Sequence, residues 1–177
     1  YPLLRINQGL DVADTTYSLS NFEFFSSMNG TWMEATFLAN VAGSLLMKLP
    51  YGNMLLGIYF YTALIQSVTA WICYRTLRKK MPAILVFVGE WIALGLCWCP
   101  STILYNYLTY LFLTYGMLLL YRGIVKGSIG CYIGAGIFLG ANVAVRMPNV
   151  VQMALIVGLW YGVCLKKEWS RLWKDTL

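Results

Sequence analysis

Five apolar runs, each close to the length of a membrane-spanning helix, limit the fold of this chain more than any other feature. They cover residues 54–74, 81–98, 103–121, 128–145 and 150–165. A helix that crosses the hydrocarbon layer of about 30 Å needs about 20 mainly apolar residues. The runs come close to that length, and the fifth is the shortest. The pattern predicts an all-α fold, a polytopic transmembrane bundle of about five helices.

The composition agrees with a surface that faces lipid. Hydrophobic residues make up 59% of the chain and charged residues only 11%, whereas a soluble domain carries about 25% charged residues. The net charge of +6 raises the possibility of a nucleic-acid partner. The basic residues, however, lie in short clusters between apolar runs, which is typical of membrane topology and not of a groove that follows phosphates. We therefore expect the lipid bilayer, and no nucleic acid, as a partner.

Three basic clusters set the expected orientation. They follow the first, third and fifth runs, and therefore fall on one side of a bundle of five spans. Their members are Arg75, Arg78, Lys79 and Lys80, then Arg122 and Lys126, then Lys166, Lys167, Arg171 and Lys174. The positive-inside rule places that side in the cytoplasm. We expect an integral protein of the bacterial plasma membrane, with its N-terminal segment outside.

The segments outside the bundle follow from this topology. Residues 1–53 are expected to form an extracytoplasmic loop with short amphipathic, interfacial helices, and residues 166–177 a cytoplasmic basic tail. Asp14 is expected to be the N-cap of a first short helix, and Thr31 and Glu34 fit a capping box for a second, over about 32–47. Because the chain begins at Tyr1 and ends in a segment that can continue, we expect a fragment of a larger protein.

Two aspartates near the start are candidates for chemistry. Asp11 and Asp14 lie three residues apart in a polar segment just before the apolar part of the chain. A pair of carboxylates at the water–lipid boundary can bind a divalent metal or act as a general base. The alternative is structural, with Asp14 serving only as a cap and Asp11 as a solvated loop residue. The spacing leaves both interpretations open.

Glu90 is an acidic residue near the middle of the second apolar run. A charge at the centre of a membrane-spanning helix costs about 2.5–3.5 kcal/mol on insertion scales, so such a residue usually faces the bundle interior or a wet cavity. A structural hydrogen bond and a functional role explain Glu90 equally well.

Arg146 and Asn106 are polar residues at the expected outer ends of two spans. Apart from Arg5 and Lys48, Arg146 is the only basic residue expected outside, and a guanidinium there can bind a lipid phosphate through two hydrogen bonds. Snorkelling or a salt bridge to an outer acid is the alternative. The tyrosines around Asn106 fit an interfacial aromatic belt. Asn106 does not, and is placed to hydrogen-bond a ligand or a carboxylate.

Glycines recur at intervals of four in the fourth run. Gly130 and Gly134 form one pair, and Gly136 and Gly140 the other. Small residues at this spacing allow membrane helices to approach closely. We expect them to mediate helix packing.

The order of these features resembles the integral-membrane glycosyltransferases of the GT-C fold. The resemblance rests on Asp14 in an outer loop, Tyr17 three residues later, interfacial helices and then a series of spans. In this superfamily the first outer loop carries an essential acidic residue, and the donor is typically a sugar on a polyprenyl phosphate. Thr15 stands where the family usually has a second acid, and the span that usually precedes the acidic loop is absent.

The resemblance implies a role for each candidate. Asp14 would act as general base on an acceptor hydroxyl, or bind a metal together with Asp11. Arg146 would stabilise the leaving lipid phosphate, and Asn106 and Tyr17 would orient donor or acceptor. Two other classes remain open: a transporter or lipid flippase that uses Glu90, and a non-catalytic membrane protein. The residues do not decide whether a divalent metal is a cofactor.

Overall fold

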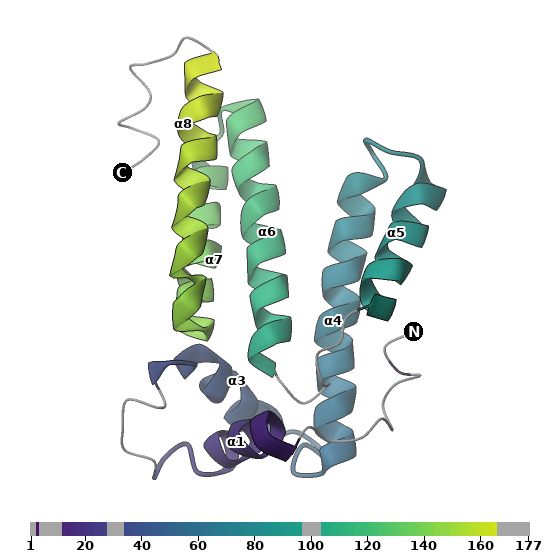
Figure 1. Ribbon diagram of the computed structural model, residues 1–177, viewed down its shortest axis with the longest axis vertical. Coiled ribbons are helices and arrows are strands. Elements are labelled where there is room, and N and C mark those ends of the chain that lie inside the picture. The colour runs from purple at the N-terminus through teal and green to yellow at the C-terminus, as the bar shows by residue number, and fades with distance from the viewer. Residues whose placement is uncertain (1–2, 4–11, 28–33, 97–103, 166–177) are drawn as a thin grey trace.

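The computed structural model describes residues 3, 12–27, 34–96 and 104–165 of the chain, and every regular element in these ranges is a helix. The elements, labelled in Figure 1, are α1 (Val12–Glu23), α3 (Phe37–Met47), α4 (Leu55–Leu77), α5 (Ala83–Leu96), α6 (Leu104–Lys126), α7 (Ile129–Val145), the 3₁₀ helix η2 (Met147–Ala154) and α8 (Leu155–Leu165). The prediction of an all-α fold is confirmed for these residues.

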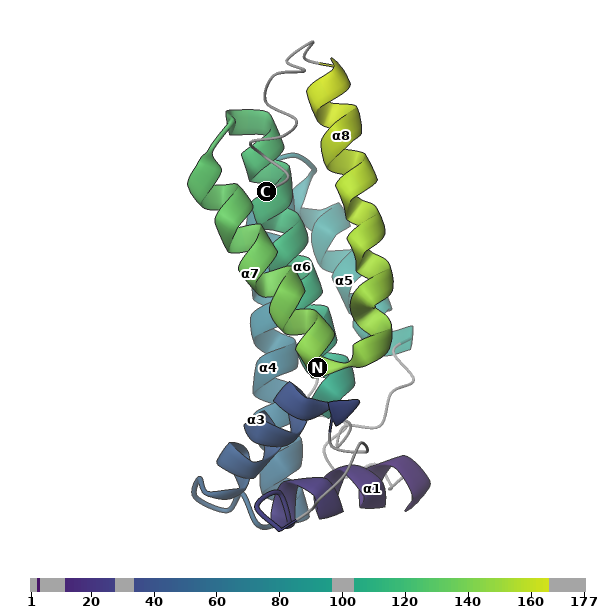
Figure 2. The ribbon, with the colours of Figure 1, turned by 90° about the vertical axis from the view of Figure 1, so that its left-hand side faces the viewer.

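The helices from α4 to α8 run up and down, and α1 and α3 lie across one end of them (Figures 1 and 2). The connections from α4 to α5 and from α6 to α7 lie at the opposite end. The basic residues at 75–80 and 122–126 therefore share an end, and α1 lies at the other end. Which end faces the cytoplasm stays a prediction.

Two helices, α4 and α6, are long and apolar enough to cross a membrane. Each has 23 residues and contains an 18-residue stretch with a mean hydropathy of 1.4. The other predicted spans correspond to shorter helices of 14 residues in α5 and 17 in α7, and to α8, whose 11 residues continue directly from η2. A bundle of about five spans therefore stays a prediction.

A small apolar core joins α1 and α3 to the bundle. Phe22 of α1 and Ala39 of α3 pack with Val145 at the end of α7 and with two residues at the start of α6, Leu104 and Leu108. All five are buried. The N–H of Met147 also donates a 3.0 Å hydrogen bond to the carbonyl of Ala35, just before α3. These contacts fix α3 against the ends of α6 and α7.

One expectation about the N-terminal helices is wrong, and another lies partly outside the described residues. Asp14 is not an N-cap, because α1 begins two residues earlier, at Val12, and Asp14 lies inside its first turn. A carboxylate in the first turn still interacts favourably with the helix dipole. The later helix begins at Phe37, with Thr36 at its N-cap and no side-chain cap bond. Thr31, half of the expected capping box, lies outside the described residues.

The glycines of α7 act as packing residues only in part. A Cβ on Gly134 would lie 3.1 Å from Leu119, but a Cβ on Gly130, Gly136 or Gly140 would meet nothing within 4 Å. The close approach of α6 and α7 depends instead on glycines of α6. A Cβ on Gly116 would lie 2.8 Å from Leu139, and one on Gly123 would lie 2.7 Å from Tyr132. The expectation for Gly130, Gly136 and Gly140 was therefore wrong.

Candidate functional site

Arg146 lies at the end of the bundle that carries α1 and α3. It ends α7 in an extended backbone conformation and precedes Pro148, which is in the first turn of η2. Its Nη1 atom donates a long hydrogen bond of 3.5 Å to Oδ1 of Asn106, and its guanidinium lies 5.2 Å from the centre of the Tyr105 ring. The Arg146 side chain is exposed. The structure thus brings together two of the predicted site residues, Arg146 and Asn106, which lie 40 positions apart.

No carboxylate among the described residues pairs with Arg146; its side-chain contacts there are with Tyr105 and Asn106. An oxygen of Asn106 accepts from only one of the five N–H groups of the guanidinium. The salt bridge considered as an alternative for Arg146 is therefore not found in this part of the chain. Within the described ranges, its positive charge has no carboxylate partner and most of its donors have no acceptor.

A network of amide side chains holds the backbone around Arg146. Nδ2 of Asn149 lies 2.9 Å from Oγ1 of Thr109, 3.0 Å from the Asn142 carbonyl and 3.2 Å from Asn142 Oδ1. Asn142 in turn donates to Oε1 of Gln152 at 2.7 Å, and Gln152 donates to the carbonyl of Leu139 at 2.5 Å. The network links α6, α7 and η2, and Asn142 is buried.

The sequence reasoning missed this amide network. The signal was Asn142, a polar amide inside an apolar run. A polar amide among apolar residues needs a hydrogen-bond partner when it is buried. Asn149 and Gln152, two amide residues that follow within ten positions, were the candidate partners.

Asp14 and Tyr17 lie on α1, and both are exposed. Among the described residues, no hydrogen bond or ion pair joins Asp14 to Arg146. The buried side of α1 carries Thr15, Ser18, Asn21 and Phe22 and packs on α3, which in turn contacts α6 and α7. Asp14 and Arg146 therefore share an end of the molecule, with α3 between α1 and the bundle (Figures 1 and 2). Asp11 lies outside the described residues.

Glu90 belongs to a separate polar group, away from this end. It is half-buried on α5, and its Oε1 atom is buried with no hydrogen-bond partner in the described part of the chain. The Cys73 thiol of α4 lies near both Glu90 and Thr114 of α6. The group therefore brings together three helices.

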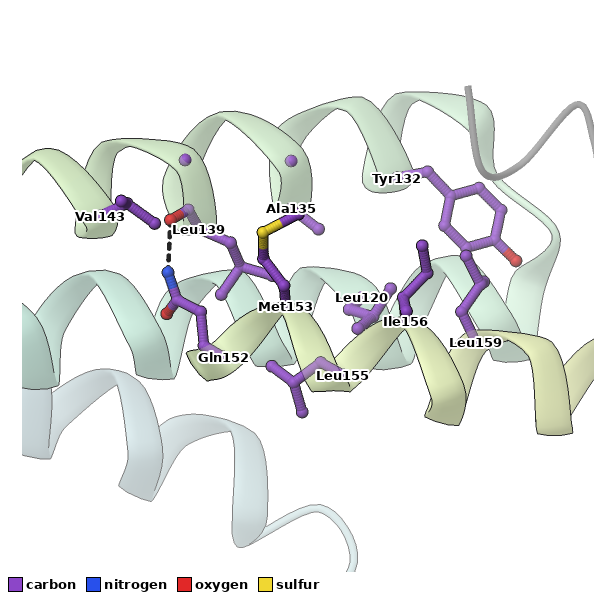
Figure 3. A pocket seen from close by; sticks show the side chains of 12 residues that line it. Leu120, Tyr132, Ala135, Leu139, Val143, Gln152, Met153, Leu155, Ile156 and Leu159 are labelled. Carbon is purple, nitrogen blue, oxygen red and sulfur yellow. Dashed lines mark hydrogen bonds between the residues drawn. The ribbon is translucent and has the colours of Figure 1, made fainter. Parts of the chain in front are cut away.

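An apolar groove of about 330 Å³ runs between α7 and the segment formed by η2 and α8. Figure 3 shows its lining side chains. The lining residues are Leu120, Tyr132, Ala135, Gly136, Leu139, Gly140, Val143, Gln152, Met153, Leu155, Ile156 and Leu159. Two further cavities lie beside the N-terminal part of α4, one against α1 and the other against the turn at Pro50 and Tyr51. Asp14, Arg146 and Glu90 line none of these three cavities.

The residues that the structure describes contain no group of three or more carboxylate, thiol or imidazole side chains that could hold a metal ion. The chain has no histidine. A metal at Asp14 would need Asp11, which is not described, as a further ligand. Metal dependence stays open.

Comparisons with known proteins gave no family model, no curated protein and no solved structure that matches this chain. The resemblance to GT-C glycosyltransferases therefore rests only on the sequence pattern of this chain.

Proposed function

We propose that this chain is the membrane-embedded part of a glycosyltransferase. In this proposal it transfers a sugar from a polyprenyl-phosphate donor at the non-cytoplasmic end of the bundle. The observation that carries the proposal is the exposed guanidinium of Arg146, which has no carboxylate partner among the described residues and lies at the same end as α1 and Asp14.

Arg146 suits the recognition of a lipid phosphate. A guanidinium binds phosphate through two parallel hydrogen bonds, and such charge-assisted bonds are about twice as strong as neutral ones. The Tyr105 ring and Asn106 hold the side chain at the end of α7. A fixed positive charge stabilises the negative charge that develops on the leaving phosphate.

The other predicted residues complete the proposed mechanism. Asp14 accepts the proton of the acceptor hydroxyl while that oxygen attacks the sugar carbon and the bond to the lipid phosphate breaks. Tyr17 orients the acceptor, and Asn106 orients the donor through Arg146. In this proposal α4 and α6 cross the membrane together with α5, α7 and the continuous segment of η2 and α8, and the C-terminal tail is cytoplasmic.

The test compares Arg146→Gln with Lys48→Gln in the complete protein. Lys48 is an exposed cation that directly follows α3, at the same end of the molecule. Loss of a charge-stabilising donor costs about 10²–10³ in rate, so we expect that loss for Arg146→Gln and near-normal transfer for Lys48→Gln. The measurement is transfer from a synthetic polyprenyl-phosphate sugar in vesicles. Equal rates for the two variants would reject the role of Arg146.

A second substitution tests the general base. A positioned general base contributes about 10²–10⁴ to the rate, so Asp14→Asn is expected to lose transfer by that factor while expression is unchanged. Glu23→Gln, which removes another exposed carboxylate of α1, is the matched control. Unchanged turnover in Asp14→Asn would remove Asp14 from the mechanism.

Transport is the second candidate. The Oε1 atom of Glu90, which is buried and has no hydrogen-bond partner among the described residues, favours it. A transporter or flippase would use this carboxyl at membrane depth. Movement of a lipid-linked sugar or ion across vesicles that depends on Glu90 but not on Asp14 would support transport. The reverse dependence would support the glycosyltransferase.

A further inference from the structure

One face of α4 changes from apolar to basic toward the end of the helix. Six exposed residues follow one another at steps of three or four positions, which places them on a single face of an α-helix. They are Phe60, Leu64, Val68, Trp71, Arg75 and Arg78, and together they form the α4 stripe. The four apolar members are 43–57% exposed. The stripe is therefore apolar along most of its length and ends in two guanidinium groups.

The α4 stripe points away from the neighbouring helices. Cys73 follows Trp71 by two positions, which is about 200° around an α-helix. Its thiol lies near Glu90 of α5 and Thr114 of α6, so these contacts are on the side of α4 opposite Trp71. From Phe60 to Trp71 the stripe extends over about 16 Å at 1.5 Å per residue. That length is about half of the hydrocarbon thickness of a bilayer, the depth of one leaflet.

Aromatic rings hold both guanidinium groups at the end of the stripe. The guanidinium of Arg75 lies 5.2 Å from the centre of the Trp71 ring, and that of Arg78 lies 5.8 Å from the centre of the Tyr74 ring. A guanidinium that stacks on a ring keeps its N–H donors at the edge of its plane. Tryptophan and tyrosine favour the level of the lipid headgroups. In a bilayer, the two rings therefore place two phosphate-binding groups at that level.

No carboxylate neutralises these two cations in the part of the chain that the structure describes. The described carboxylates are Asp14, Glu23, Glu34 and Glu90. The first three belong to α1 and the segment before α3, at the other end of the bundle (Figure 1), and the fourth lies near Cys73. Lys79 and Lys80 are exposed and add two positive charges directly after Arg78. Like charges three residues apart on a helix repel each other, and an anion between Arg75 and Arg78 removes that repulsion.

We infer that the α4 stripe binds an anionic phospholipid of the leaflet at this end of the bundle. The lipid phosphate lies between Arg75 and Arg78, and an acyl chain lies along the apolar part of the stripe. Basic residues directly beyond a membrane helix are typical of anionic-lipid recognition. A partner helix would have to bring a carboxylate to headgroup depth, whereas an anionic lipid carries its charge there. The site is independent of the proposed transfer reaction, because it lies at the end of the bundle opposite Asp14.

The test compares two charge-matched double variants of the complete protein. One combines Arg75→Gln with Arg78→Gln, and the control combines Arg122→Gln with Lys126→Gln, two exposed cations of α6 at the same end. Phosphatidylglycerol is titrated into protein in micelles that contain phosphatidylcholine, and bound lipid is counted by native mass spectrometry. Hydrogen bonds to charged groups are worth about tenfold or more in affinity, which is the loss expected for the first variant. The control is expected to bind phosphatidylglycerol like the wild type.

Two outcomes of this comparison would overturn the inference. Equal losses in the two double variants would show a general attraction to positive charge and no site on α4. Unchanged binding in the Arg75→Gln, Arg78→Gln variant would show that the stripe does not hold the phosphate. If that double variant does not melt cooperatively in phosphatidylcholine alone, the single variants Arg75→Gln and Arg78→Gln are compared with the control instead.

A further arm tests the guanidinium geometry. Arg75→Lys with Arg78→Lys keeps both charges but removes the planar donors that bind phosphate in pairs and stack on the rings. We expect this variant to lose part of the affinity for phosphatidylglycerol. Wild-type affinity would overturn the two-guanidinium site.

The last arms distinguish the lipid from other occupants. Glycerol 3-phosphate carries the phosphate without acyl chains, so at equal concentration it is expected to leave phosphatidylglycerol bound. Displacement of the lipid would assign the stripe to a soluble phosphate and overturn the inference. The same mass spectra report protein partners. A second copy or another protein that is lost with Arg75→Gln and Arg78→Gln, while phosphatidylglycerol binding is unchanged, would also overturn it.

Discussion

The two sides of α7 differ in how closely they are packed, although glycines lie along both. On the α6 side, glycines of α6 receive Leu139 and Tyr132, and Phe138 packs edge-on against Tyr115 at 4.6 Å between ring centroids. On the α8 side, Gly136 and Gly140 face an open groove. The difference shows that a glycine promotes close packing only where a neighbouring helix offers a side chain to fill the space.

The structure also indicates why the second side stays open. The amide network fixes η2 against α7 through polar contacts at one end of the groove. Farther along, α8 meets α6 at Gly162, where a Cβ would lie 2.9 Å from Ile124. The segment of η2 and α8 is therefore held at its η2 end by hydrogen bonds to α7, and farther along α8 packs on α6. The space between α7 and α8 therefore stays open.

Gly116→Leu should have the largest effect on stability. The new side chain would overlap Leu139, whose backbone nitrogen is also only 3.5 Å from the Cβ position. Overpacking of this kind costs about 1–3 kcal/mol, so we expect a clear fall in the melting temperature of the purified protein. A normal melting temperature would show that α6 and α7 are not closely packed here.

Asn142→Leu should have an intermediate effect. It removes the bond to Gln152 and leaves Asn149 without one of its acceptors. Side-chain hydrogen bonds between membrane helices are worth about 0.6 kcal/mol on average and up to about 1.7 kcal/mol. We expect a moderate fall in melting temperature together with slower transfer, because η2 and Arg146 lose their support. Asn53→Leu, at an exposed turn, is the control, and an equal change in both variants would exclude a specific network.

Gly136→Leu should have the smallest effect on stability, and its sign should be opposite. No atom lies within 4 Å of the new Cβ, and replacing a helical glycine by a better helix former is worth about 0.5–1 kcal/mol. The melting temperature should be unchanged or slightly higher. A fall as large as that of Gly116→Leu would show that the groove side of α7 is packed after all.

The sequence predicted the helices better than their contacts. The first and fourth apolar runs, 54–74 and 128–145, correspond to α4 over Leu55–Leu77 and α7 over Ile129–Val145. These boundaries depend on local signals, namely basic clusters, glycine and proline. Arg146 and Asn106 were each identified, but their contact joins positions 40 apart, which no local pattern reveals. Periodicity also does not show which glycines face a neighbour.

The first residue of α1 is another feature that local sequence signals did not predict. The sequence predicts a helix there with Asp14 as its cap, whereas α1 begins at Val12. Aspartate is favourable both as a cap and within the first turn. The residue type alone therefore does not fix the first residue of the helix.

The most direct test of the account is the side of the membrane on which each end of the bundle lies. Single cysteines at Ser27, Met147 and Lys79, all exposed, would be introduced into the complete protein after its native cysteines are replaced by serine. A membrane-impermeant thiol reagent is then applied to right-side-out and inverted vesicles. The account predicts that Ser27→Cys and Met147→Cys react in right-side-out vesicles and Lys79→Cys only in inverted ones. Labelling of Ser27→Cys and Met147→Cys only in inverted vesicles would contradict it.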